Sequence, residues 1–410
     1  MRLISFFLIT LFATSVPAHA DGKSHDAYCD LAGYPSALRE THIVVDSLLV
    51  TPEPGPPLEE NKGWRQRVYE LLDADDQGAL KRWAARERIT VSIAEADGSG
   101  LKQIFTGCMP LYSSDEQRQL SEKNSSLDVF LGRSWRDNLE KSVKTFRRSV
   151  TVSMVQAAKD VKAPQKGQPF ITSGLGQSLA RGYRPTYQYG TPRLVILTDL
   201  SSYEFPDGDP QALRAKGRKD AAVWAADFGR AEVHVLGASG TIDNAQKEHL
   251  KALFLADKGN VLTIAGLRGA LMAVAPPVDV KVYQGTVKFP DGDYPVTLRL
   301  SLDANRRAVN SWMEVQSDQL RFVPLEGALS CVDEDACTFL ETGDFAQVWT
   351  DDPQGDPEFE NWMPFVGFRD MKFDLKGDRI TGMITDSSGY VPGMEEGLAF
   401  TLTRVENGAF

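Results

Sequence analysis

Histidine is scarce in this sequence. The 410 residues contain five histidines, and none of them follows His249. Because histidine is the commonest general base in enzymes and a frequent metal ligand, its scarcity disfavours both kinds of site. No histidine lies near Cys331 or Cys337, which disfavours a zinc site at that pair of cysteines.

Long apolar segments and an excess of positive charge are also absent. Beyond the first residues of the chain, no segment reaches the ~18 uninterrupted apolar residues typical of a transmembrane helix. The sequence has 45 Lys and Arg residues against 56 Asp and Glu residues, a formal net charge of -11. An acidic chain is a poor partner for nucleic acid and for anionic lipid. We therefore expect a protein that does not span a membrane and does not bind nucleic acid.

The beginning of the sequence has the pattern of a secretory signal peptide. A short basic start, Met1-Arg2, precedes an almost wholly apolar stretch from Leu3 to Val16. Ala18-His19-Ala20 then matches the small residues of a cleavage site. We expect a signal peptide over residues 1–20 and export of the mature chain into a bacterial periplasm.

The four cysteines fit an exported protein. An even number of cysteines in an oxidising compartment predicts disulfides. Cys331 and Cys337 are separated by a short acidic segment, and their proximity favours pairing, which leaves Cys29 to pair with Cys108. A metal site is the alternative use of these four residues.

The pattern of apolar residues changes once along the chain. Up to residue 275, short apolar runs alternate with segments of helical spacing, which predicts an α/β domain with a doubly wound sheet over residues 21–275. Beyond Ala275-Pro276-Pro277, short runs with a period of two are separated by turn residues. This pattern predicts a smaller antiparallel all-β domain, a barrel or a sandwich, over residues 278–410.

Two apolar runs of the first domain end near an acidic residue. His42-Ile43-Val44-Val45 precedes Asp46, and Leu194-Val195-Ile196-Leu197 ends two residues before Asp199. Runs of this kind are typical of strands buried on both faces of a parallel sheet. Ligands of such sheets bind beyond the carboxyl ends of the strands, so the two acids are candidates for one shared site. The alternative is that each aspartate caps the loop or helix that follows it.

These motifs resemble those of a von Willebrand factor A-type domain. The resemblance covers residues 38–270 and depends on the strand before Asp46, the loop at 172–179 and the strand before Asp199. The sequence is similar to an exported bacterial branch of that family in which the second strand runs into a Cys-Xaa-Pro motif, here Cys108-Met109-Pro110. We recognise no family for the second domain.

The resemblance implies a metal-ion-dependent adhesion site. The family uses an Asp-x-Ser-x-Ser motif, then a Thr and then an Asp, which together give Mg²⁺ or another divalent cation hard oxygen ligands. By position, Asp46, Ser173 and Asp199 correspond to the first acid, the threonine and the last acid. Leu48 and Val50 replace the two serines, so a complete adhesion site is absent. These residues then form either a weak cation site or a surface that binds a partner without metal.

We expect an exported, non-catalytic binding or scaffold protein. Its partner would be another envelope or periplasmic protein, and its binding residues would be Asp46, Ser173 and Asp199. The alternative is a hydrolase of envelope polymers with a carboxylate-based site in the C-terminal β domain, because a pair of carboxylates can hydrolyse glycosides without histidine.

Overall fold

The computed structural model describes most of both expected domains. The described residues are 29, 38–50, 64–72, 83–123, 134–158, 161, 166–185, 190–237, 242–265, 277–289, 292–316, 322–333, 336–341, 369–386 and 397–405. The expected signal peptide, residues 1–20, and Ala275-Pro276 of the expected boundary lie outside them. Within the described residues, no helix is long and apolar enough to cross a membrane.

A mixed sheet of six described strands forms the first domain, in the order β3-β2-β1-β5-β7-β8. Neighbouring strands are parallel except for β2 and β3, which pair in an antiparallel hairpin at one edge. The strands are β1 (Arg39–Val45), β2 (Arg88–Ala94), β3 (Leu101–Cys108), β5 (Thr191–Leu197), β7 (Glu232–Leu236) and β8 (Asn260–Ala265). The chain extends the sheet in one direction after β1 and in the other after β5, as in a doubly wound fold.

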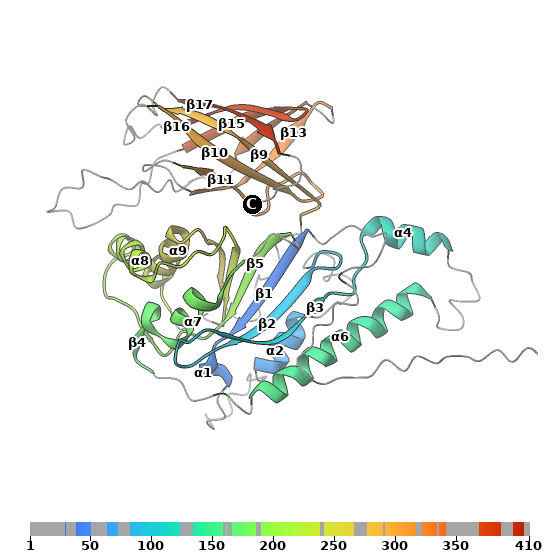
Figure 1. The fold of residues 1–410 in the computed structure, drawn as a ribbon, viewed down its shortest axis with the longest axis vertical. Coiled ribbons are helices and arrows are strands. Elements are labelled where there is room, and N and C mark those ends of the chain that lie inside the picture. The colour runs from blue at the N-terminus through green and yellow to red at the C-terminus, as the bar shows by residue number, and fades with distance from the viewer. Residues whose placement is uncertain are drawn as a thin grey trace, which may run out of the picture.

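Helices cover both faces of this sheet (Figure 1). One face carries α2 (Trp64–Leu71) and α6 (Trp135–Ala157), and the other carries α7 (Gly174–Gly182), α8 (Pro210–Trp224) and α9 (Asn244–Ala256). Successive side chains of a strand point to opposite faces, so each central strand contributes to two cores. In β1, Ile43 and Val45 belong to the first core and Val44 to the second.

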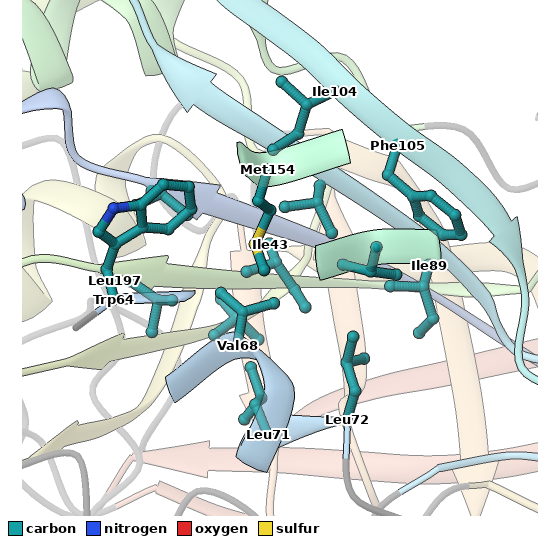
Figure 2. Close-up of a cluster of buried hydrophobic side chains, with 14 of the residues drawn as sticks. Ile43, Trp64, Val68, Leu71, Leu72, Ile89, Ile104, Phe105, Met154 and Leu197 are labelled. Carbon is teal, nitrogen blue, oxygen red and sulfur yellow. The ribbon is translucent and has the colours of Figure 1, made fainter. Parts of the chain in front are cut away.

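Figure 2 shows the core beneath α2 and α6, where Val68 and Leu71 of α2 and Met154 of α6 lie against Ile43 and Leu197 of the strands. The apolar residues between Ser134 and Val161 recur at steps of three and four, which predicts a long helix, and α6 confirms it. It begins at a capping box, in which the side chain of Ser134 and that of Asp137 each accept from the other's backbone N–H. The buried side chains of α6 recur at steps of three and four residues, and they are Val143, Phe146, Val150, Met154 and Ala157.

Several elements of the first domain differ from the expectation. The segment at 172–179, expected to be a loop, is mostly helix, because Ser173 is the N-cap of α7. The expected sheet was parallel, whereas β3 returns antiparallel to β2 through the tight turn that contains Gly98 and Gly100. The sequence did not predict α4 (Ser114–Lys123) or the small parallel pair of β4 (Gln168–Pro169) and β6 (Tyr203–Glu204).

A separate antiparallel sheet of nine described strands forms the second domain, in the order β12-β11-β10-β9-β17-β16-β15-β14-β13. Its strands are β9 (Asp279–Phe289), β10 (Gly292–Leu302), β11 (Ser311–Val315), β12 (Phe322–Leu325), β13 (Gly327–Cys331), β14 (Ala336–Glu341), β15 (Arg369–Lys376), β16 (Arg379–Asp386) and β17 (Leu398–Arg404). The edge strand β13 approaches the turn after β10, where Ala308 N donates to Gly327 O at 2.8 Å and Leu329 N to Arg306 O at 3.0 Å. The sheet is therefore nearly closed, which favours a barrel over a sandwich.

The inside of this second sheet is a single apolar core. Val296, Leu298, Leu300 and other inward side chains fill it, as the period of two predicted. Phe339 of β14 and Phe373 of β15 are opposite each other on neighbouring strands, and their rings stack with the centroids 4.6 Å apart.

Both expected disulfides are present. Cys331 and Cys337 are opposite each other in the pairing of β13 with β14, and their bond joins these two strands. Cys29 is bonded to Cys108 at the end of β3. The bonds fit export into an oxidising compartment.

The second domain packs against the edge of the first sheet at which β1 and β5 begin (Figure 1). Arg299 of β10 donates to the hydroxyl of Thr191 in β5 at 2.7 Å. Glu314 of β11 forms ion pairs with Arg230 and with Lys258, the latter at 2.9 Å. The carboxyl ends of the parallel strands therefore lie at the opposite edge of the sheet, away from these contacts.

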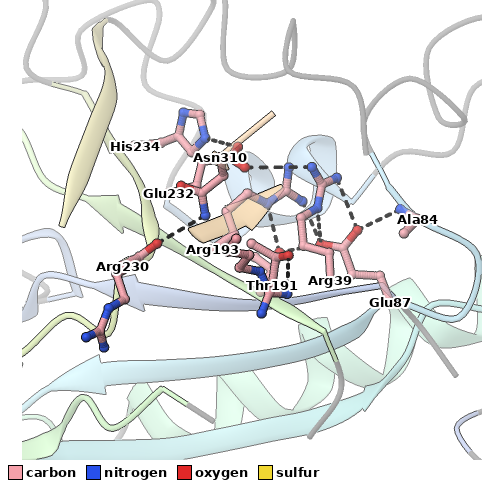
Figure 3. Close-up of polar contacts among 11 residues, drawn as sticks. Arg39, Ala84, Glu87, Thr191, Arg193, Arg230, Glu232, His234 and Asn310 are labelled. Carbon is pink, nitrogen blue, oxygen red and sulfur yellow. Dashed lines mark hydrogen bonds and ion pairs between the residues drawn. The ribbon is translucent and has the colours of Figure 1, made fainter. Parts of the chain in front are cut away.

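A buried cluster of charged side chains lies at the amino end of the strands (Figure 3). Glu87 is fully buried and accepts hydrogen bonds from Arg39 at 3.2 Å, Arg193 at 2.9 Å and the backbone of Ala84 at 2.7 Å. Thr41 also donates to Glu87. The carboxylate of Glu87 is thus a shared partner of two buried guanidinium groups, which would be costly to bury alone.

Glu232 supplies the second negative charge of this cluster. Its carboxylate lies 2.6 Å from Nε2 of His234 and 3.9 Å from Arg39. Burial alone would raise the pKa of Glu232, but the hydrogen bond and charge of His234 and the charge of Arg39 lower it to about 2. Glu232 therefore stays ionised throughout the neutral range.

We expect Glu87→Gln to lower the free energy of unfolding by about 3–5 kcal/mol, because the change removes one of the two buried negative charges that face Arg39 and Arg193 and leaves Glu232 alone opposite them. Urea denaturation followed by circular dichroism measures this change. Asp115→Asn is the matched control, because Asp115 is 77% exposed and its ion pair with Arg118 lies on the surface. The control should change stability by less than about 0.5 kcal/mol. Equal stability of the two variants would contradict this account of the cluster.

Candidate functional site

The candidate site lies beyond the carboxyl ends of β1 and β5. The strands that follow β1 in the chain extend the sheet to one side, and those that follow β5 extend it to the other. β1 and β5 are parallel neighbours, with β2 on the far side of β1 and β7 on the far side of β5. The helices that follow such a pair cover opposite faces, which leaves a crevice beyond the carboxyl ends of the two strands. Asp46 follows β1 there, and Thr198 and Asp199 follow β5.

Asp46 is held at this point by hydrogen bonds to both oxygens of its carboxylate. Oδ1 accepts from the backbone N–H of Leu48 at 3.0 Å, and Oδ2 accepts from the hydroxyl of Thr198 at 2.7 Å and from that of Tyr203. Burial raises the pKa of Asp46, the three hydrogen bonds act in the opposite direction, and the nearby charge of Asp199 raises it further. The carboxylate is thus part of a buried polar network at the end of β1.

Tyr203 brings a second element into this network. It lies on the short strand β6, and its ring packs edge-on against Phe170 with the centroids 5.5 Å apart. Its hydroxyl donates to Asp46, and the hydroxyls of Thr198 and Ser173 lie near it. Burial and the charge of Asp46 raise the pKa of Tyr203 well above its usual value, so the phenol remains a proton donor.

Ser173 reaches the same network from the start of α7. Its hydroxyl accepts from the backbone N–H of Gly176 at 3.1 Å, as an N-cap, and donates to the carbonyl of Phe170 at 2.7 Å. The structure therefore brings together the three positions that the sequence proposed. Tyr203, which the sequence analysis did not single out, lies between Ser173 and Asp46.

The loop that carries Asp199 has a strained backbone. Leu200 has a φ of +56°, a left-handed conformation that is uncommon for a leucine, and its side chain is buried. The backbone N–H of Leu200 donates to Thr198, and that of Ser201 donates to Oδ1 of Asp199 at 3.1 Å. Asp199 itself remains partly exposed.

The three proposed site residues differ in what a partner could touch. Asp46 and Ser173 are each 1% exposed, so a partner could not contact their side chains directly. A partner could contact the partly exposed Asp199, and Asp46 and Ser173 would act by positioning the loops around it. Asp46 and Asp199 also accept hydrogen bonds from the backbone two residues later. The capping alternative therefore holds for both residues, alongside the shared network.

The residues present do not fit a divalent cation. In the described part of the chain, no group of three or more His, Cys, Asp and Glu side chains is arranged to hold a metal ion. Leu48 and Val50 occupy the two serine positions of the adhesion motif and have no side-chain oxygen to offer a cation. Val50 packs in the apolar core, and the backbone N–H of Leu48 donates to Asp46. The oxygens of Asp46 already accept three hydrogen bonds, whereas a cation would need them as ligands.

A histidine and a serine also meet on the face of the sheet beneath α7. Nε2 of His42 in β1 lies 2.8 Å from Oγ of Ser92 in β2, a pairing that the sequence analysis missed. Burial lowers the pKa of His42 to about 4, so its imidazole is neutral at physiological pH. Ser92 is 1% exposed, so a polymeric substrate has no access to its hydroxyl. The geometry of this pair is that of a structural hydrogen bond.

The β domain gives the hydrolase hypothesis little support among its described residues. Its interior is apolar, and its buried carboxylate, Asp303, accepts from the backbone N–H groups of Asn305 at 2.8 Å and Arg307 at 2.9 Å. Glu314 is engaged by Arg230 and Lys258 of the first domain. These acids fix a turn and the contact between domains.

Comparison with known proteins does not assign the chain. No protein-family model matches it, and no curated protein is significantly similar to it.

We expect His42→Gln to change the pH dependence of stability. The pKa of His42 is about 4 in the folded protein against 6.5 without burial, so the unfolded chain binds the proton more readily between these values. The stability that the neutral His42 allows is fully present above pH 6.5. As the pH falls from 6.5 towards 4, the free energy of unfolding decreases by at most about 1.4 kcal/mol per pH unit. Urea unfolding at several pH values between these limits measures the loss.

The variant His42→Gln should lose less stability than the wild type over this range. Ser92→Ala is the matched control, because it removes the hydrogen-bond partner but keeps the imidazole, and it should retain the wild-type slope. The same slope in His42→Gln and the wild type would show that His42 is not held neutral by the fold.

Proposed function

We propose that this chain is an exported, non-catalytic binding protein that recognises another envelope or periplasmic protein. Its first domain would be a divergent von Willebrand factor A-type domain. Its binding surface would be formed by the loops that follow the carboxyl ends of β1 and β5, and we call this surface the carboxyl edge. The predicted signal peptide and the two disulfides support export into an oxidising compartment such as the periplasm. The position of Asp199 beside the β1–β5 pair supports the choice of surface.

The observation that carries this proposal is the strained loop around Asp199. A leucine at positive φ costs about 1–3 kcal/mol and persists where its surroundings fix it, often at a functional site. Here the buried side chain of Leu200 and the hydrogen bonds of Thr198 fix the loop. Capping alone does not need this strain, because an aspartate can cap an unstrained turn. The loop instead holds the carboxylate of Asp199 in one place, as a preorganised binding residue requires.

The chemistry of the site also suggests what the partner presents. Without a cation, the surface cannot ligate a carboxylate of the partner. The partly exposed carboxylate of Asp199 is an acceptor, and it would pair with a lysine or arginine side chain or with backbone N–H groups. We therefore propose a partner that offers donors or positive charge at this contact.

Crosslinked capture from intact periplasm tests this proposal. A tagged wild-type chain should retain a specific partner, and Asp199→Ala should weaken capture at least about tenfold, as expected for a central interface residue. Asp378→Ala is the matched control, because Asp378 is a 72% exposed acid on the β domain. This control should capture the partner as well as the wild type does.

A chelator should leave capture by the wild type unchanged, because the proposed contact contains no metal. Undiminished capture by Asp199→Ala would contradict the proposal for this surface and would direct attention to the β domain. Circular dichroism of each variant shows whether a loss of capture reflects a loss of fold.

A further inference from the structure

The hydroxyl of Tyr203 lies where the side chains of the carboxyl edge converge. It donates to Oδ2 of Asp46, which also accepts from Thr198, and the hydroxyl of Ser173 lies near it. The residues around this one oxygen atom are an acid and two hydroxyl side chains. They are the kinds of group that would otherwise surround a hard cation.

The cost of removing a carboxylate from water must be offset by hydrogen bonds or by positive charge. A tyrosine supplies a hydrogen bond, whereas a cation supplies charge. Mg²⁺ would bring two positive charges and would need about six oxygen ligands in near-octahedral geometry. The phenol brings one proton and no net charge, and with the hydroxyl of Thr198 and the N–H of Leu48 it satisfies Asp46 by hydrogen bonds. The network is therefore complete without an ion.

The ring of Tyr203 is anchored so that its hydroxyl stays in this position. β6 pairs with β4, in which Gln168 is opposite Tyr203 and Pro169 opposite Glu204. The ring also packs against Phe170, which belongs to the core beneath α8 and α9. The strand pairing fixes the backbone of Tyr203, and movement of its ring out of the network would break the packing against Phe170. The side chain is therefore a fixed part of the site.

We propose that the Tyr203 hydroxyl takes the place of a divalent cation in this site and makes the surface independent of metal. Tyr203 is a positioning residue in this account. It fixes Asp46 and, through Thr198, the loop of Asp199. The inference concerns the ion alone and does not depend on the existence of a protein partner.

Binding of Mn²⁺ to the full-length protein tests this inference, with calorimetry and electron paramagnetic resonance as readouts. The wild type should bind no Mn²⁺ at this site. Tyr203→Ala removes the ring and exposes Asp46, Thr198 and Asp199 to an ion and its water ligands. This variant should acquire a weak site, with a Kd on the order of 1 mM.

A double variant, Tyr203→Ala with Asp46→Asn, locates any gained site, because it should lose the binding that Tyr203→Ala acquires. Saturable Mn²⁺ binding by the wild type that Asp46→Asn abolishes would overturn the inference. So would a folded Tyr203→Ala variant that binds no more Mn²⁺ than the wild type.

Tyr203→Ser provides the same test if Tyr203→Ala does not fold, because it also removes the ring and retains a small hydroxyl. A folded Tyr203→Ser variant should likewise gain Mn²⁺ binding that depends on Asp46, and its failure to do so contradicts the inference. The wild-type measurement decides independently of both variants. Partner capture does not enter these readouts, so the inference and the proposed function can fail separately.

Discussion

The parallel pairing of β1 with β5 is the constraint on which the site depends. It places Val45 opposite Leu197, and the backbone N–H of Asp46 donates to the carbonyl of Leu197 at 2.9 Å. Asp46 therefore lies next to Thr198, although the two are 152 residues apart in the sequence. The apolar runs that form these strands are buried on both faces, so a slip in their register would disturb two cores at once.

The two edges of the first sheet have different chemistry. At the amino edge, buried arginines and glutamates form the cluster around Glu87, and the β domain packs against this edge through Thr191, Arg230 and Lys258. At the carboxyl edge, hydroxyl groups surround one buried acid, and the second acid reaches the surface. The described contacts of the β domain thus fix the first sheet at its amino edge and leave the candidate site at the other.

The sequence predicted what depends on local pattern. The strands before Asp46 and Asp199 and the helix after Ser134 followed from apolar spacing, and both disulfides followed from the number of cysteines and their positions. All of these predictions are confirmed. The sequence could not reveal Tyr203, because its contact with Asp46 spans 157 residues and a lone tyrosine before a glutamate carries no local signal. The pairing of Glu87 with Arg193 was hidden for the same reason, since it spans 106 residues. The antiparallel β3 is a different case, because an edge strand and a central strand can share one pattern of alternation.

The central claim is that the carboxyl edge is a hydrogen-bonded site that needs no cation. Anomalous diffraction from crystals of the wild-type protein grown with Mn²⁺ tests it most directly. This account predicts no anomalous peak at Asp46 or Asp199 and a Tyr203 hydroxyl that remains bonded to Asp46. A Mn²⁺ ion about 2.2 Å from the carboxylate oxygens of Asp46, with Tyr203 displaced from the network, would contradict it.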